Sequence, residues 1–170
     1  GTVVTDSREA SAGSLYVARR GENADGHAFV HGAIERGAVA VIAERELEEA
    51  VAQIIVEDST RALGDLARAH VDALRSRGTL DVIAMTGSVG KTTTKDLLLQ
   101  ILSEDGPTVA PKLSFNNEVG LPLTALQADE TTQHLVLEMG ASGPGHISYL
   151  TDIVSPDVAI ELCVGHAHVG

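Results

Sequence analysis

The chain has 170 residues, 44% of them hydrophobic, which is enough for one ordinary domain or two small ones with packed cores. Its formal net charge of −12 comes without a basic stripe, so nucleic acid is an unexpected partner, and no apolar run is long enough for membrane insertion. A single cysteine excludes an internal disulfide framework and no signal segment opens the chain, so we expect a cytoplasmic protein.

The first part of the chain alternates short strand and helix patterns. Strand-like runs occupy 14–18, 38–43 and 53–57, and a helical pattern occupies 27–38. Only 2% of the residues are aromatic, so the cores must be built from Val, Ile, Leu and Ala, which suits parallel sheets buried under helices. These features predict the α/β class.

A long helix is predicted next. Ser59 is expected to cap it and Gly78 to close it. The apolar spacing of three and four residues along it is formed by Leu63, Leu66, His70 and Leu74. We expect this helix to join two domains, residues 1–78 and residues 79–170.

The second part of the chain repeats the alternation. Strands are expected at 81–85, 108–110, 134–139 and 157–162, and helices at 91–103, within 112–127 and at 143–154. This order implies a parallel sheet with right-handed crossovers. The chain stops soon after the last strand, whereas such a sheet is normally covered on both faces, so we expect a fragment of a longer protein.

A glycine turn between strand 81–85 and the following helix has the context of a P-loop. Glycines let backbone N–H groups converge on an anion, Lys91 can reach the β- and γ-phosphates, and the Thr92 hydroxyl can ligate Mg²⁺. The general pattern would place its first glycine at Met85, so the matched core is the shorter T-G-x-x-G-K-T. The alternative is an ordinary glycine-rich turn with an exposed lysine.

The stretch MTGSVGKTTTKDLL resembles the ATP site of the Mur ligases, the amide-forming enzymes of peptidoglycan precursor synthesis. Three stretches follow in the order expected of one member: SFNNEVGLPLTAL (114–126), LVLEMGAS (135–142) and GHAHVG (165–170). Residues 6–42 resemble the family's uridine-nucleotide domain. The resemblance implies a small N-terminal α/β uridine-nucleotide domain followed by part of a P-loop-type, parallel-sheet central domain, which in the family continues beyond residue 170.

For the ATP site, the resemblance implies that the phosphates are wrapped by Gly87, Ser88, Val89, Gly90, Lys91, Thr92 and Thr93. It implies catalytic roles for Lys91, Glu138 and His168, and magnesium binding by Thr92, Glu138 and His168. Glu138 ends an apolar strand, where a parallel sheet presents its ligand side, although a lone glutamate there is usually just solvated. The His168 role rests mainly on the resemblance, because Mg²⁺ prefers oxygen ligands.

Two neighbouring residues do not follow the family's pattern. His166 has no counterpart in the motif and is interpreted as incidental. Cys163 stands where members commonly carry Asn, and we interpret it as a small core residue.

The resemblance also implies substrate-binding residues. Those expected around the uridine diphosphate are Ser7, Arg8, Asp25, Gly26 and His27, and those expected to face the sugar-peptide are Asn116 and Asn117. His27 could equally be a plain helix-start residue. The asparagine pair could form an Asx turn that starts the next helix.

The implied activity is ATP-dependent ligation of D-alanyl-D-alanine to UDP-N-acetylmuramoyl-tripeptide through an acyl phosphate, with Mg²⁺, in a monomeric enzyme. The Asn-Asn-Glu-x-Gly-x-Pro stretch is the most member-specific piece. One alternative is a sister ligase that adds a diamino acid to the dipeptide precursor. Another is a non-catalytic nucleotide-binding module. A folylpolyglutamate-synthase-like ligase shares the loop type but not the first domain.

Overall fold

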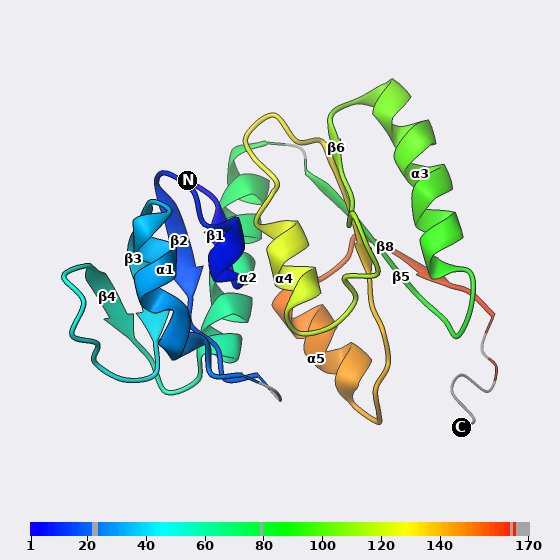
Figure 1. Ribbon diagram of the computed structural model, residues 1–170. Coiled ribbons are helices and arrows are strands. Elements are labelled where there is room, and N and C mark those ends of the chain that lie inside the picture. Colours follow the sequence, from blue (N-terminus) through cyan, green and yellow to red (C-terminus); the bar gives the residue numbers. More distant parts are fainter. Residues whose placement is uncertain (22–23, 79, 164, 166–170) are drawn as a thin grey trace. The chain divides into compact units, whose positions relative to one another are not determined.

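The computed structural model describes residues 1–21, 24–78, 80–163 and 165 (Figure 1). The contacts within the chain divide it into two compact units, Gly1–Leu63 and Gly64–Gly170. Each unit contains a four-stranded sheet, and all strand pairings in both sheets are parallel. The predicted α/β class with parallel sheets is confirmed.

The first unit has the strand order β1-β2-β3-β4. Its elements are β1 (Val3–Val4), the 3-10 helix η1 (Ser7–Glu9), β2 (Ser14–Val17), the 3-10 helix η2 (Gly26–Phe29), α1 (Val30–Glu35), β3 (Ala38–Ala43) and β4 (Ala52–Ile55). Val30 and Ala33 of α1 pack against Val41 of β3 in its core. Strand β1 was not predicted, because two residues are too few to show an alternating pattern.

Helix α1 is shorter than the predicted 27–38. Its approach is the 3-10 helix η2, which Asp25 caps by accepting a hydrogen bond from the His27 N–H at 3.0 Å. Just past its end, Gly37 has a φ of +107°, a backbone conformation that side-chain-bearing residues avoid. The helical pattern in the sequence therefore extends beyond the helix at both ends.

Helix α2 (Ser59–Arg77) is capped by Asp58, not by Ser59 as predicted. The Asp58 carboxylate accepts hydrogen bonds from the N–H groups of Thr60 at 2.8 Å and of the residue after it at 2.9 Å. Ser59 is the first helical residue, and its hydroxyl donates to the carboxylate of Glu44 at 2.9 Å instead.

The buried face of α2 differs in part from the predicted spacing. It consists of Leu63, Ala67, Val71 and Leu74, whereas Leu66 and His70 are only half-buried. Most of α2 packs in the core of the second unit. The two compact units therefore divide after Leu63, before the domain boundary expected after residue 78. That domain boundary stays a prediction. No helix in the described part of the chain, α2 included, is long and apolar enough to cross a membrane.

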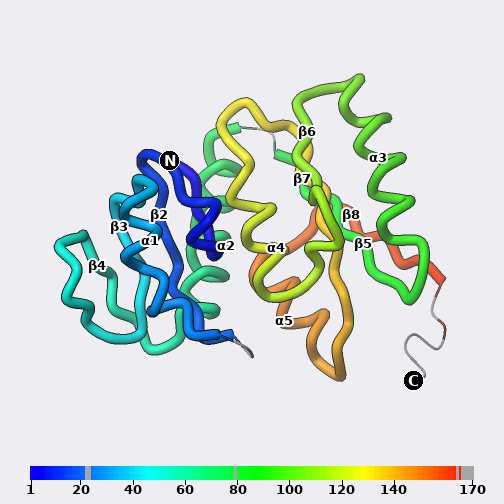
Figure 2. The backbone as a smooth tube through the Cα atoms, viewed as in Figure 1, coloured from blue at the N-terminus to red at the C-terminus, as the bar shows by residue number. Residues whose placement is uncertain are grey.

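The second unit has the strand order β6-β7-β5-β8. Its further elements are β5 (Asp81–Thr86), α3 (Lys91–Asp105), β6 (Thr108–Val109), α4 (Gly120–Ala125), β7 (His134–Glu138), α5 (His146–Ile153) and β8 (Val158–Glu161). Helix α3 covers one face of the sheet, and α4 and α5 cover the other (Figures 1 and 2). The predicted order of elements after residue 79 is confirmed, with ends that differ by a few residues.

Candidate functional site

The glycine turn joins the carboxyl end of β5 to the first residue of α3, as predicted (Figure 2). Gly87 has a φ of +144°, and a Cβ there would lie 2.8 Å from the Cβ of Leu162. Gly90, the residue before the helix, has a φ of +89°. Glycine is therefore required at both positions, and the backbone N–H groups at the start of α3 have no side-chain cap to satisfy them. Such a helix start attracts phosphate.

Lys91 folds back over this turn, where its Nζ donates to the carbonyl oxygen of Gly87 at 2.5 Å. Ser88 ties the turn to the segment that follows β8: its N–H donates to the carbonyl of Cys163 at 2.9 Å, and its hydroxyl donates to the carbonyl of Gly165 at 2.7 Å. Val89, at the tip, is exposed, as are Thr92 and Thr93.

Cys163 is exposed, so its interpretation as a small core residue was wrong. Its position after the end of β8 explains the difference, because the sheet no longer covers it. What it contributes to the turn is a main-chain carbonyl, which any residue could supply.

Glu138 ends β7 and is fully buried, and neither of its carboxylate oxygens has a hydrogen-bond partner among the described residues. Burial raises the pKa of this carboxyl, while the ammonium groups of Lys95 and Lys91 and the nearby Thr92 hydroxyl act to lower it. An unpartnered buried carboxylate beside a hydroxyl supplies the hard oxygen ligands that Mg²⁺ prefers, so these residues fit a magnesium ion.

The rest of the expected metal site lies outside the described residues, because His168 and His166 do. Within the described residues, no group of three or more His, Cys, Asp or Glu side chains is arranged to hold a metal ion. The described candidates for magnesium are therefore Glu138 and Thr92.

The two asparagines have different environments. The main-chain carbonyl of Asn116 accepts a hydrogen bond from the Gly140 N–H at 2.7 Å. The side-chain amide of Asn116 packs against Gly140 so closely that a Cβ on Gly140 would lie 2.8 Å from Oδ1. Asn117 Oδ1 accepts from the N–H groups of Val119 at 3.2 Å and Gly120 at 2.9 Å. Asn117 thus forms the Asx turn that starts α4, the alternative considered for this pair.

A cleft of about 300 Å³ brings the glycine turn and the asparagines together. Gly87, Ser88 and Lys91 line one part of it, and Asn116 and Asn117 another. Ser142 and His146 also line this cleft, and sequence reasoning had not selected either of them. Ser142 is the last residue of the stretch LVLEMGAS, but neither it nor His146 was given a role, because their proximity to the turn arises only in the folded sheet.

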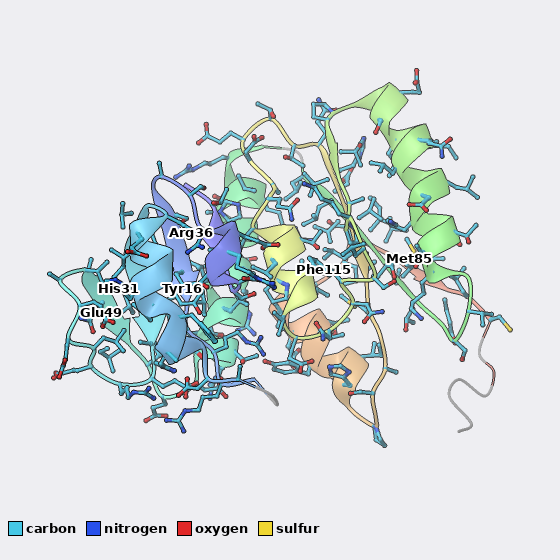
Figure 3. The ribbon with its side chains drawn as sticks, viewed as in Figure 1. Tyr16, His31, Arg36, Glu49, Met85 and Phe115 are labelled. Carbon is cyan, nitrogen blue, oxygen red and sulfur yellow. The ribbon has the colours of Figure 1, made fainter. Side chains whose placement is uncertain are left out.

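The first unit contains a larger cavity, of about 780 Å³. Its lining includes Ser7, Arg8 and Gly26, which were expected at the uridine diphosphate. It also includes three basic residues that were not predicted, Arg19, His31 and Arg36. Figure 3 shows the side chains of Tyr16, His31 and Arg36 in this unit. A cavity lined with cations in a chain of net charge −12 favours an anionic ligand.

Arg8 is already paired within this cavity. Its guanidinium donates to both carboxylate oxygens of Asp6, at 2.9 and 2.6 Å, and these hydrogen bonds lower the pKa of Asp6 to about 2. The guanidinium of Arg36 donates to the carbonyl of Gly32 at 2.8 Å and has no carboxylate partner among the described contacts.

Asp25 and His27 are not among the residues that line the cavity. The His27 side chain is buried, with Nδ1 2.5 Å from the Asp25 carboxylate and Nε2 accepting the Glu44 N–H at 2.9 Å. Both ring nitrogens are thus engaged inside the fold. Gly26 is tightly enclosed, because a Cβ there would lie 2.7 Å from the carbonyl oxygen of Arg19.

Two family models match the chain. The model described as "Mur ligase family, catalytic domain" matches residues 2–71. The model described as "Mur ligase middle domain" matches residues 85–170, which include the glycine turn.

Individual relatives agree with these matches. The UDP-N-acetylmuramoyl-tripeptide–D-alanyl-D-alanine ligase of Synechocystis sp. is 40% identical over 99% of this chain and 37% of that protein. A solved MurF from Acinetobacter baumannii has a TM-score of 0.90 and 40% identity, over 99% of this chain and 37% of its own. A solved MurF ligase from Thermotoga maritima in complex with ADP has a TM-score of 0.83 and 39% identity, over 99% and 38%. The chain therefore spans a little more than a third of the length of these relatives.

Proposed function

The chain belongs to the Mur ligase family, whose members are ATP-dependent ligases, and we propose that it provides two parts of a MurF-type enzyme. In this proposal the first unit binds the uridine nucleotide of UDP-N-acetylmuramoyl-tripeptide, and the second unit binds ATP. The product is the amide between the tripeptide and D-alanyl-D-alanine. Because ATP and nucleotide-linked precursors are cytoplasmic metabolites, we expect the reaction in the cytoplasm.

The observation that carries this proposal is the set of groups gathered at the carboxyl ends of β5 and β7 in the second sheet. Gly87 and Gly90 form an anion-binding helix start, Lys91 lies over it, and the buried, unpartnered carboxylate of Glu138 stands at the end of the neighbouring strand. A glycine-rich turn without nucleotide chemistry would not need a buried carboxylate beside two lysines, since such a group is costly. This combination favours a catalytic ATP site over a non-catalytic module.

The chemistry follows from the poor reactivity of a carboxylate. In the proposed reaction the terminal carboxylate of the tripeptide attacks the γ-phosphorus of ATP, ADP leaves, and an acyl phosphate forms. The amine of D-alanyl-D-alanine then displaces phosphate through a tetrahedral intermediate. Lys91 and the N–H groups of the turn offset the negative charge that develops on the phosphoryl oxygens. Magnesium, held by Glu138 and Thr92, would supply further neutralisation of the phosphates.

The cation-lined cavity of the first unit supports the nucleotide part of the proposal. Arg36 and Arg19 are the candidates for the diphosphate, because neither guanidinium has a carboxylate partner among the described contacts. Arg8 is held by Asp6 and would serve as an oriented donor, with Ser7 beside it in the same lining. Asp25 and His27 would act indirectly, by shaping η2 around Gly26.

The sister ligase that adds a diamino acid is not favoured. The stretch from Asn116 to Pro122 has the form expected of the D-alanyl-D-alanine ligase, and the relatives at about 40% identity carry that name. The two ligases differ in the peptide that they accept, so substrate dependence distinguishes them.

The test measures phosphate release from ATP by a protein that contains this chain and has the full length of its relatives. UDP-N-acetylmuramoyl-tripeptide is present, and D-alanyl-D-alanine is either added or omitted. We expect sustained release only with both substrates. Release that requires the dipeptide precursor and a diamino acid would instead support the sister ligase. If neither substrate pair gave phosphate release, the proposal would be contradicted.

A further inference from the structure

Ser142, His146 and Glu118 form a chain of hydrogen bonds beside the ATP-site cleft. His146 is the first residue of α5, and its side chain is 14% exposed. Its Nδ1 accepts the Ser142 backbone N–H at 3.1 Å and lies 2.8 Å from the Ser142 hydroxyl oxygen. Its Nε2 lies 3.2 Å from the carboxylate of Glu118, which directly follows Asn117.

These contacts indicate which ring nitrogen of His146 carries the hydrogen. A backbone N–H group can only donate, so Nδ1 of His146 carries a lone pair and the ring proton is on Nε2, where it is donated to Glu118. The Ser142 hydroxyl can donate to the same lone pair. The order of hydroxyl, imidazole and carboxylate is the one by which hydrolases draw a proton from a serine.

The position of this hydrogen-bonded cluster matches a need of the proposed reaction. Ser142 and His146 line the same cleft as Lys91 and Gly87, where the acyl phosphate would form. The incoming amine is largely protonated at neutral pH and needs its lone pair to attack. Among the described residues of the cleft lining, the ionisable side chains are Lys91 and His146, and Lys91 is a cation held at the phosphate turn.

We propose that Ser142 and His146 accept the protons that the attacking amine loses, with Glu118 as the positioning residue. The ammonium group gives a proton to Ser142 Oγ while the hydroxyl proton passes to Nδ1, and the imidazolium is stabilised through Nε2–H by Glu118. The nitrogen lone pair forms the C–N bond, and phosphate leaves with the electrons of the C–O bond. The nitrogen loses its second proton by the same route, after the imidazolium has released the first to water.

This inference rests on the proposed function and makes a prediction that the function alone does not. Hydroxylamine is largely unprotonated at neutral pH, so it can attack an acyl phosphate without a proton acceptor and yields a hydroxamate and phosphate. A variant that lacks the acceptor should therefore lose the reaction with D-alanyl-D-alanine and keep the reaction with hydroxylamine.

The experiment compares both nucleophiles in the protein at the full length of its relatives, with ATP and UDP-N-acetylmuramoyl-tripeptide present. His146→Gln keeps a donor for Glu118 but cannot take up a proton. We expect it to lower ligation of D-alanyl-D-alanine by about 100-fold or more and to leave hydroxamate formation unchanged. Ser142→Ala and Glu118→Gln are expected to lower ligation in the same selective way. Ser148→Ala, an exposed serine of the same helix, is the matched control and should change neither rate.

The outcomes separate the two proposals. Absence of hydroxamate with the unmodified protein would mean that no acyl phosphate forms, which contradicts the proposed function. Hydroxamate formation by the unmodified protein, with both nucleophiles slowed equally in His146→Gln, would assign the cluster a purely structural role and overturn the proton-acceptor inference.

Discussion

Glu138 lies directly opposite Met85 in the parallel register of β7 and β5, one residue before β5 ends and the glycine turn follows. The sheet itself therefore brings this carboxylate to the edge at which Lys91 begins α3. No loop is needed to position it, so the distance between the carboxylate and the phosphate turn is set by backbone hydrogen bonds.

Replacing Glu138 by Gln should weaken metal binding. The amide keeps the shape but removes the charge, and we expect binding of Mn²⁺ in the presence of ATP to weaken by about tenfold or more, measured by electron paramagnetic resonance. The metal-free free energy of unfolding should not fall, because an unpartnered buried carboxylate is costly. Glu104→Gln, on the exposed side of α3, is the control. Unchanged metal affinity in Glu138→Gln would argue against the ligand role.

Replacing Lys91 by Ala should remove the phosphate clamp. We expect ATP-dependent phosphate release by the protein at the full length of its relatives to fall by about 100-fold or more, because a cation that faces developing negative charge is lost. Lys112→Ala removes an exposed lysine of the same unit and should leave the rate unchanged. Near-normal release in Lys91→Ala would refute the clamp.

Replacing Gly87 by Ala should strain the turn. The backbone φ of +144° and the 2.8 Å approach to Leu162 both exclude a Cβ, so we expect a loss of about 1–3 kcal/mol in the free energy of unfolding. Denaturant titration of the chain measures it. Gly143→Ala is the matched control, because a Cβ there meets nothing within 4 Å and its φ is not positive. Equal effects of the two substitutions would contradict the argument.

Replacing Arg36 by Ala should weaken the nucleotide cavity. Loss of one charged donor is expected to lower the affinity of the chain for UDP by about tenfold or more, measured by isothermal titration calorimetry. Arg61→Ala, which removes an exposed arginine of the same unit outside the cavity lining, should retain full affinity. If both variants bound UDP equally well, the diphosphate would have to be placed elsewhere.

The stability of the first unit should depend on the ionisation of Asp25. Hydrogen bonds from the His27 N–H and side chain, and from Arg45, lower the pKa of Asp25 from 3.8 to about 2. Because the folded state favours the carboxylate, its stabilising contribution is present above pH 3.8 and is lost as the pH falls towards about 2. Asp25→Asn should therefore lower the melting temperature at neutral pH and make no difference below pH 2.

The control for this pH dependence is Glu48→Gln, which alters an exposed acid of the same unit. Its melting curve should follow that of the unmodified chain throughout. A deficit in Asp25→Asn that persisted unchanged in strong acid would show that shape, and not charge, explains the effect.

The parts of the fold that could be predicted are those with a signal along the chain. Strands such as β5 and β7 are continuous apolar runs, and α3 starts where the glycine turn ends. Two-residue strands such as β1 leave no period to detect. The cap of α2 was misplaced by one residue, because Asp58 and Ser59 are both good capping residues and the choice depends on the tertiary contact between Ser59 and Glu44.

The candidate site divides in the same way. The glycine turn and Lys91 could be selected because the turn is a local motif. Glu138 was selected through the resemblance to the Mur ligases, because a lone glutamate at a strand end is usually just solvated. The contact between His146 and Glu118 joins residues 28 apart in sequence, and no sequence pattern predicts it. Lys95 is buried, with its Nζ 3.0 Å from the carbonyl oxygen of Pro111. Its burial could not be predicted either, because an isolated lysine in a helix normally points to solvent.

The enclosed imidazole of His27 gives the first unit a spectroscopic marker. Nε2 accepts a backbone N–H from Glu44, so the ring proton resides on Nδ1 and points to Asp25, shielded from water. Such a proton exchanges slowly and should appear as a separate signal in a proton magnetic resonance spectrum. It disappears when η2 separates from the end of β3, so the folded state of this unit can be followed without any ligand or label.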